Sequence, residues 1–367
     1  MDDHRLGMLR SVASCLALVV LTLATLVLAP ASTGAATTTS LAPITTVMPP
    51  NFGLPDIVFY GTPFGKPTVY VAEGVIDAVN AKTDALIGSF GQGDLQSSTV
   101  PSCGALGGRG PDGVLSLTVG GSNQVFVGNG NSTLQEYTLS SPGSGKLAKT
   151  IDTGGQCRAD EMAYDPVDHL ILIANPGEST PFATFVSVHS NPSKDQVVGK
   201  ISFPGAVGLE QSVYDPKTGR FYLNVPQTTA TNPDLGAVAV INPKSKKQIG
   251  SFPITGCNST GLALDPANQE ALIGCSAGHG EMIMNMHDGA IVHALSSLPN
   301  CDQVAFDQST GDFLAPGIGG PLSVISARSG KVLSQTTVDG VTHSAAAGDG
   351  KVFVALVSNG IEIFHAH

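Results

Sequence analysis

The chain has 367 residues, with 44 glycines, 24 prolines and no tryptophan, and its net charge is −11. This charge argues against nucleic acid or an anionic membrane surface as a partner, because both attract basic proteins. Only 13% of the residues are charged, and the many turn-forming residues are typical of a protein built from short strands and tight turns.

The N-terminal segment has the features of a targeting signal. Arg5 and Arg10 precede an uncharged run, 11–29, that is rich in Leu and Val, and small residues follow up to Ala36. This order predicts a signal peptide over 1–36 and export to the periplasm, the cell envelope or the medium. The apolar run is also about long enough to cross a bilayer, so an uncleaved anchor is the alternative. Residues 37–53, rich in Thr, Ser and Pro, predict a linker.

A repeated pattern follows the linker. Alternating apolar segments end at the anchors Asp165, Asp215, Asp265, Asp307 and Gly348, which are 50, 50, 42 and 41 residues apart. This is the period of a four-stranded propeller blade. Each anchor precedes a turn and further short alternating strands. In the second of these units the predicted strands are 221–225, 236–241 and 247–252.

Two further units begin near 56–60 and 113–117. The sequence therefore predicts an all-β fold, a seven-bladed β-propeller of four-stranded antiparallel blades over 54–367. The last unit ends after its third strand, 360–364, which would leave a sheet edge unpaired. We expect a strand from 41–47 to fill that edge and close the ring, which places a ring-closing strand within the linker segment 37–53.

The candidate functional positions lie five residues before each anchor, where each innermost strand begins. Equivalent positions on a ring of strands converge on one axis. Acidic residues number 29 of 367, so random placement would put fewer than one among seven such positions. The predicted ring positions are Asp56, Asp112, Asp160, Glu210, Thr260, Asp302 and His343.

Carboxylates that converge repel one another and favour a bound cation. The six ring residues other than Thr260 are therefore candidate metal ligands. Their oxygens suit calcium, magnesium or manganese, and the imidazole of His343 leaves zinc or iron as further options. One residue further along the strands, Glu161, Gln211 and Gln303 are candidates to support the ligands or to bond neighbouring blades. The alternative for the whole ring is a set of polar side chains that water solvates.

Five cysteines follow the targeting segment: Cys103, Cys157, Cys257, Cys275 and Cys301. Export would allow them to pair. In the repeat frame four of these cysteines lie just before an innermost strand, and Cys275 lies at the end of a second strand, which runs back to the same face. All five are therefore expected near one mouth of the ring. Cys103–Cys157 is one expected bridge, Cys257–Cys275 or Cys257–Cys301 is the other, and one thiol is left over.

The repeat resembles the YVTN or YncE-like seven-bladed propellers of exported bacterial proteins. The resemblance rests on the Asp-Pro turns, on strands such as 68–71 and 124–127, and on Gly110-Pro-Asp-Gly113 and Gly340-Val-Thr-His343, which are similar to the family's blade opening. More distant similarity to streptogramin lyase-like and gluconolactonase-like propellers implies a metal at the channel mouth. In such an enzyme His343 and Glu210 would be the acid–base residues.

Two functions follow from these patterns. The first is a monomeric exported binding protein with a cation or small ligand in its channel and a small-molecule, envelope or protein ligand at its rim, where loops usually carry recognition. The second is a metal-dependent lyase or lactonase. The loops that would form the rim are 91–110, 175–181 and 227–235.

Overall fold

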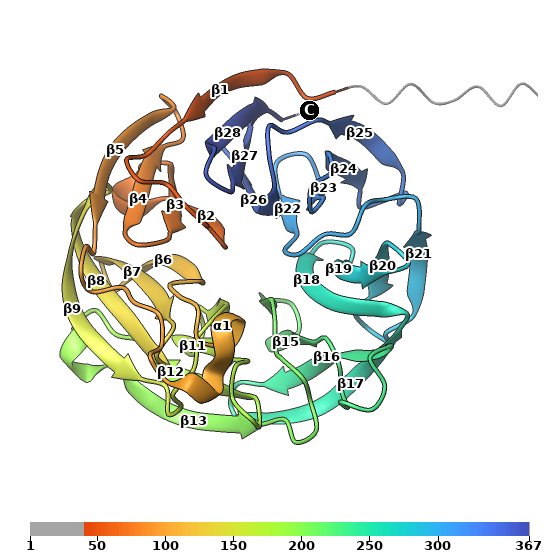
Figure 1. The fold of residues 1–367 in the computed structure, drawn as a ribbon, viewed down its shortest axis with the longest axis horizontal. Helices are drawn as coiled ribbons and strands as arrows, with labels where there is room; N and C mark the ends of the chain where they lie inside the picture. The colour runs from red at the N-terminus through yellow and green to blue at the C-terminus, as the bar shows by residue number, and fades with distance from the viewer. Residues whose placement is uncertain (1–39, 367) are drawn as a thin grey trace, which may run out of the picture. The chain divides into compact units, whose positions relative to one another are not determined.

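The structure, a computed structural model, describes residues 40–366, so the predicted signal peptide over 1–36 lies outside the described residues. Residues 40–366 form seven four-stranded antiparallel sheets arranged as a β-propeller (Figure 1). The repeat in the sequence therefore predicted the fold correctly. In this part of the chain no helix is both long and apolar enough to cross a membrane.

Six blades take their strands in chain order, with the innermost strand first. The first three consist of β2 (Val58–Gly61), β3 (Thr68–Ala72), β4 (Ile76–Asn80) and β5 (Ala85–Phe90); β6 (Val114–Val119), β7 (Ser122–Asn129), β8 (Thr133–Ser141) and β9 (Ser144–Asp152); and β10 (Met162–Asp165), β11 (Leu170–Asn175), β12 (Phe182–Ser187) and β13 (Gln196–Ser202). The next three consist of β14 (Ser212–Asp215), β15 (Arg220–Val225), β16 (Leu235–Asn242) and β17 (Lys247–Thr255); β18 (Cys257–Asp265), β19 (Glu270–Gly278), β20 (Glu281–Asn285) and β21 (Ile291–Leu295); and β22 (Ala305–Asp307), β23 (Asp312–Pro316), β24 (Leu322–Ser326) and β25 (Val332–Thr336).

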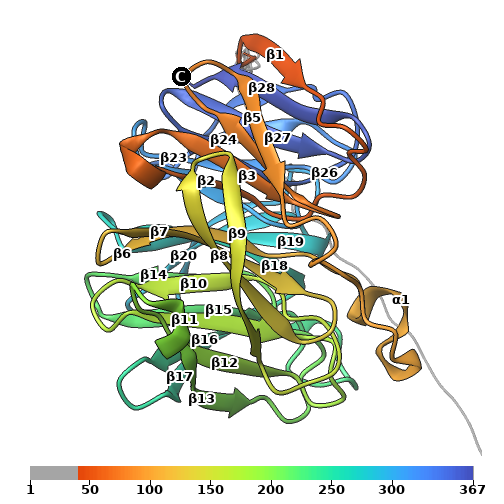
Figure 2. The same ribbon diagram turned by 90° about the vertical axis from the view of Figure 1, so that its left-hand side faces the viewer.

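Helical structure within residues 40–366 is limited to single turns: η1 (Pro63–Gly65), η2 (Pro101–Cys103), α1 (Gly104–Gly107) and η3 (Pro192–Lys194). The side view shows that α1 stands out from one face of the ring (Figure 2). Because α1 belongs to the loop that leads into β6, this is the face at which the chain enters the innermost strands.

The seventh blade closes the ring. It contains β26 (Thr342–Gly348), β27 (Lys351–Leu356) and β28 (Gly360–His365), and its outer strand is β1 (Pro43–Val47). β1 pairs antiparallel with β28, with Val47 opposite Ile361 and Pro43 opposite Phe364. The ring-closing strand expected from 41–47 is confirmed, and it gives the backbone groups of β28 the partners that a sheet edge lacks.

The aspartates of the repeat act as turn residues. In the turn after β14, Oδ1 of Asp215 accepts the backbone N–H of Lys217 at 2.9 Å, and Oδ2 accepts that of Thr218 at 3.2 Å. Asp165 and Asp265 make the same pair of contacts, again two and three residues ahead. Each carboxylate satisfies N–H groups of a tight reversal, which explains why aspartate recurs at these positions.

The core of the described chain consists of seven apolar clusters, and each cluster joins two neighbouring blades. In the cluster between the third and fourth blades, Phe185 of β12 meets Phe221 of β15 at 6.2 Å between ring centroids. Both rings are fully buried, and each contributes about 1.5–3 kcal/mol. The apolar residues of each strand thus pack between blades, which leaves the axis to the ends of the innermost strands.

Two glycines allow neighbouring blades to approach closely at the axis. A Cβ on Gly113 would lie 2.3 Å from the carbonyl oxygen of Asp160, and one on Gly261 would lie 2.5 Å from that of Asp302. Both distances are shorter than any real contact, so only glycine fits. These glycines therefore bring two acidic ring positions against the preceding blade.

Candidate metal centre at the hub

Six of the seven predicted ring residues belong to one network of ion pairs near the start of the innermost strands. We call this network the hub, and its residues are Asp56, Asp112, Asp160, Glu210, Asp302 and His343. They come from six different blades: five lie in the loop just before an innermost strand, and His343 is the second residue of β26. The repeat frame alone therefore placed these side chains together correctly.

Thr260, the remaining ring position, has a structural role. Its hydroxyl donates to the backbone oxygens of Cys301, at 3.4 Å, and Asp302, at 3.1 Å. It therefore fixes the loop that carries Asp302 and offers no free ligand to the hub.

Two arginines that were not identified from the sequence neutralise part of the negative charge of the hub. Nη2 of Arg158 lies 2.8 Å from Asp160 and 3.7 Å from Glu210, and its Nη1 lies 3.7 Å from Asp112. Arg109 lies 3.3 Å from Asp112 and 3.7 Å from Asp56. The sequence did contain a sign of this role. Only four arginines follow residue 40, and Arg158 and Arg109 lie two and three residues, respectively, before a predicted ring position.

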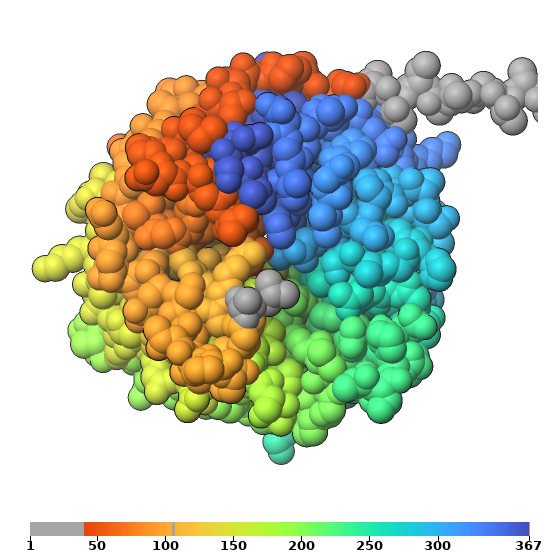
Figure 3. Space-filling view, viewed as in Figure 1, coloured from red at the N-terminus to blue at the C-terminus, as the bar shows by residue number. Residues whose placement is uncertain are grey.

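A disulfide joins the two arginine-bearing loops. Cys103 pairs with Cys157, the residue directly before Arg158, as expected from the sequence. The backbone N–H of Arg158 also donates to the carbonyl oxygen of Gly107, at 2.8 Å. The orange segment that includes this loop extends over the face toward its centre (Figure 3).

Burial and mutual repulsion disfavour the charged carboxylates. Burial, followed by the charge of Asp56, raises the pKa of Asp112 to about 6. Burial raises the pKa of Glu210 to about 8 and that of Asp160 well above its usual range, although Arg158 opposes both shifts. Burial lowers the pKa of Arg158, but Asp160 and Glu210 outweigh it, and the net shift is upward. The arginine therefore stays charged within a pocket of carboxyl groups.

The hub is short of positive charge. Including Glu161, six carboxyl groups face two guanidinium groups and one imidazole. The hydrogen bond that His343 donates to the carboxylate of Asp302 raises the pKa of His343, so the imidazole favours its charged form. Two sets of ligand atoms lie within 4.8 Å of one another and could hold a metal ion: Asp56, Asp302 and His343, and Asp56, Asp112 and Asp160.

The two candidate sets differ in the positive charge that the arginines already place beside them. Arg109 and Arg158 both contact Asp112, and Arg158 contacts Asp160, so the second set already has its counter-charges. In the first set, Asp302 has only His343, 3.1 Å away through Nδ1, as a charged partner among the described residues. The same nitrogen lies 4.0 Å from Asp56. Apart from the contact of Asp56 with Arg109, the set of Asp56, Asp302 and His343 therefore has no guanidinium group beside it among the described residues.

The three residues one step further along the strands link blades across the channel. Gln211 donates to the carbonyl oxygen of Val304 at 3.1 Å and accepts the N–H of Leu262 at 2.7 Å, so it bonds neighbouring blades. Gln303 donates to Glu161 at 2.8 Å, and its amide nitrogen also lies 3.5 Å from Asp56. Gln303 thus contacts one of the three metal-ligand candidates.

The candidate acid–base pair is not joined directly. Glu210 contacts Arg158 and His343 contacts Asp302 and Asp56, and no hydrogen bond or ion pair connects Glu210 with His343 in the described part of the chain. The two residues belong to different parts of the hub network.

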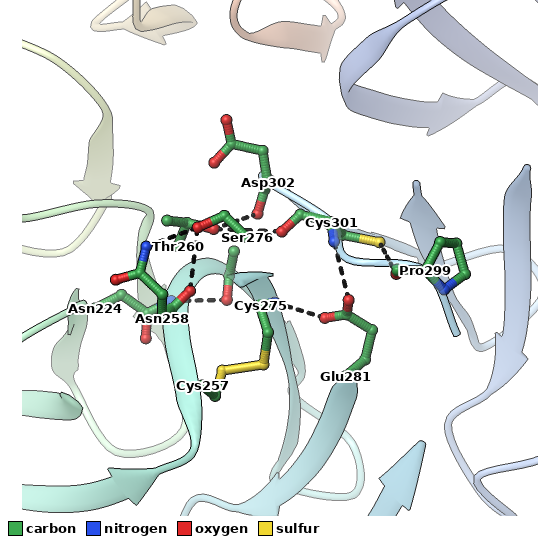
Figure 4. The surroundings of a disulfide bond; sticks show 11 residues. Asn224, Cys257, Asn258, Thr260, Cys275, Ser276, Glu281, Pro299, Cys301 and Asp302 are labelled. Carbon is green, nitrogen blue, oxygen red and sulfur yellow. Dashed lines mark hydrogen bonds between the residues drawn. A yellow bond between two sulfur atoms is a disulfide. The ribbon is translucent and has the colours of Figure 1, made fainter. Parts of the chain in front are cut away.

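The second disulfide joins Cys257 to Cys275, with the thiol of Cys301 free and buried (Figure 4). Contrary to the sequence expectation, Cys257 begins β18 and Cys275 lies inside β19, because these strands are longer than the repeat frame indicated. Glu281 accepts the N–H of Cys275 at 2.7 Å and that of Cys301 at 3.0 Å. The two disulfides indicate that the protein folds in a non-reducing compartment.

No family model and no curated protein matches the chain. Among solved structures, a chain in "Crystal Structure of Mitotic Checkpoint Complex" aligns with a TM-score of 0.67 over 95% of this chain and 100% of its own length, at 12% sequence identity. Similarity at this level of identity shows the propeller fold alone.

Proposed function

We propose that this chain is an exported binding protein whose hub holds one divalent cation through Asp56, Asp302 and His343. The observation that supports it most is the charge asymmetry of the hub: Asp112, Asp160 and Glu210 contact Arg158, Asp56 contacts Arg109, and Asp302 has His343 as its only charged partner among the described residues. Two carboxylates and one imidazole suit manganese best among the ions expected from the sequence, with calcium, magnesium, zinc and iron as competitors.

Export is supported by the two disulfides and by the charged-then-apolar order of the N-terminal residues. The Asp-Pro turns support membership of the YVTN or YncE-like propellers. Binding is favoured over the lyase or lactonase alternative because Glu210, its candidate acid–base partner, is engaged by Arg158. The loops over 91–110, 175–181 and 227–235 are the proposed rim surface for an envelope or protein ligand.

Manganese binding tests the proposal. The chain is stripped with a chelator, and free Mn²⁺ is measured by electron paramagnetic resonance during a titration. We expect one ion per wild-type chain and a loss of affinity on the order of 10- to 100-fold or more for Asp302→Asn. Affinity should rise with pH, because the metal replaces the proton on Nδ1 of His343.

Asp112→Asn is the matched control, since it removes the same charge from the set that the arginines neutralise. It should retain most of the manganese affinity. Wild-type protein that binds no manganese would refute the proposal. A larger loss in Asp112→Asn than in Asp302→Asn would place the ion in the other carboxylate set.

A further inference from the structure

A cavity of about 720 Å³ lies along the innermost strands, on the side of the ring positions that leads toward the Asp-Pro turns. Residues of all seven blades line it, beginning one position after the ring residue in four blades, at Ile57, Gly113, Glu161 and Gln211, and two positions after it in the other three. Its volume is within the range of about 300–1,000 Å³ found for small-molecule sites. It is therefore large enough for a small organic ligand and is distinct from the metal-ligand candidates.

The walls of this cavity are mainly aliphatic and aromatic. Besides Tyr60, four half-buried rings, Phe59, Tyr164, Tyr214 and Phe306, come from four different blades. No lysine, arginine or histidine is among the described residues that line it. The cavity thus offers apolar contact area and aromatic faces, and it offers nothing to neutralise an anion.

Glu161 supplies a buried acceptor at the inner end of the cavity. The residue is 3% exposed, and Oε1 receives the hydrogen bond from Gln303 at 2.8 Å. Oε2 is buried and has no hydrogen-bond partner. A buried polar atom without a partner is costly, and a ligand that donates a hydrogen bond here would remove that cost. Gln211, the other polar residue at this depth, already uses its amide between blades.

We infer that this cavity binds a small molecule with an apolar body and a protonated amine. The ammonium group donates to Oε2 of Glu161, and the body packs against the four rings, whose faces attract cations. The carboxyl groups of the hub just beyond Glu161 favour the same sign of charge. This site is separate from the proposed metal site and does not require an ion there.

Three probes that share one body distinguish the charge of the ligand: phenylbutylamine, phenylbutanol and phenylbutyrate. Each is titrated into metal-free protein by calorimetry, with saturation-transfer NMR as a second readout. The amine should bind with one molecule per chain. The alcohol should bind about tenfold or more weakly, the difference that one charge-assisted hydrogen bond makes, and the carboxylate should not bind.

Two variants locate the site. Glu161→Gln keeps the shape and removes the carboxyl group that would ionise when the ammonium group binds, so its affinity for the amine should fall to that for the alcohol. Ala347→Phe fills the cavity from the innermost strand of the last blade and should abolish binding of both. Glu281→Gln is the control, because Glu281 is a buried carboxyl group outside the cavity, and it should bind the amine as the wild type does.

Absence of amine binding to the wild type, equal affinities for amine and alcohol, or unchanged amine affinity in Glu161→Gln would each overturn the inference. If Glu161→Gln does not fold, the amine-to-alcohol ratio of the wild type and the Ala347→Phe result decide it. Because the protein is metal-free throughout, failure of the manganese titration leaves this outcome unaffected.

Discussion

Replacement of Arg158 by methionine tests the electrostatic account of the hub. Methionine keeps much of the apolar stem and removes the guanidinium group that contacts Asp112, Asp160 and Glu210. Asp160 and Glu210 then lose their guanidinium partner while they remain buried, and Asp112 keeps Arg109. Arg220→Met is the matched control, because Arg220 is exposed at the start of β15.

The magnitude follows from the burial of the ion pairs. Removing one member of a buried charge network costs about 3–5 kcal/mol, since its partners stay desolvated. For about 330 folded residues, an unfolding entropy of about 2.1 cal/mol/K per residue converts this into a fall in Tm of about 4–7 °C. The control substitution should stay within about 0.5 kcal/mol.

The sign of the pH dependence gives a stricter test. In the wild type Arg158 opposes the upward pKa shifts of Asp160 and Glu210, so its removal raises both pKa values further. Well below pH 4 these groups are neutral in the folded and unfolded states, so the deficit of the variant should be smallest at the acid end of the range. It should grow as the pH rises toward 8, where the unfolded chain is ionised and the folded chain resists ionisation.

The assay is thermal and urea unfolding of Arg158→Met, Arg158→Lys and Arg220→Met between pH 4 and 8. The lysine variant keeps the charge and should lose less stability than the methionine variant. Millimolar Mn²⁺ should recover part of the loss in Arg158→Met, because Asp56, Asp112 and Asp160 form a set that could hold an ion. A loss of stability in Arg158→Met that is independent of pH, or that is no larger than the loss in Arg220→Met, would refute this electrostatic account of the hub.

Three further outcomes are expected. Replacing Cys103 and Cys157 by serine should lower the free energy of unfolding by about 4 kcal/mol through loop closure, as measured in urea. A chain that starts after residue 50 should lose about 3–6 kcal/mol, because Leu41 and Val47 are buried, and unchanged melting would contradict the ring closure. Burial raises the pKa of Glu281 to about 8, so wild-type stability relative to Glu281→Gln should fall as pH rises from about 4.5 to 8, and a constant difference would contradict it.

The parts of this structure that repeat could be predicted from the sequence. Five regularly spaced anchors and two further units with similar strands predicted seven blades, the missing strand of the last blade predicted β1, and the blade frame predicted the convergence of the ring positions. Each of these follows from a periodic backbone, in which equivalent positions have equivalent places. Cys103–Cys157 was predictable for the same reason, as both residues precede neighbouring innermost strands.

The parts that depend on loops could not be predicted in the same way. Arg109 and Arg158 lie outside the strands, where no period fixes side-chain direction, so their contacts with the hub became apparent only from the structure. The partner of Cys257 was ambiguous because β18 and β19 extend beyond the repeat frame and bring Cys275 to a Cα distance of 5.3 Å. The cavity beside Glu161 arises from the gap that seven inner strands leave between them.

The first disulfide and the charge asymmetry of the hub belong to one arrangement. Cys103–Cys157 ties together the loops that carry Arg109 and Arg158, and both guanidinium groups reach Asp112. Positive charge is therefore held on one side of the axis by a covalent link. The opposite side carries Asp302 and His343, and the loop of Asp302 is held by hydrogen bonds from Thr260 and to Glu281. A mobile cation is attracted to the side that fixed cations leave uncompensated, so in the proposed metal site the disulfide would contribute to selecting where the ion binds.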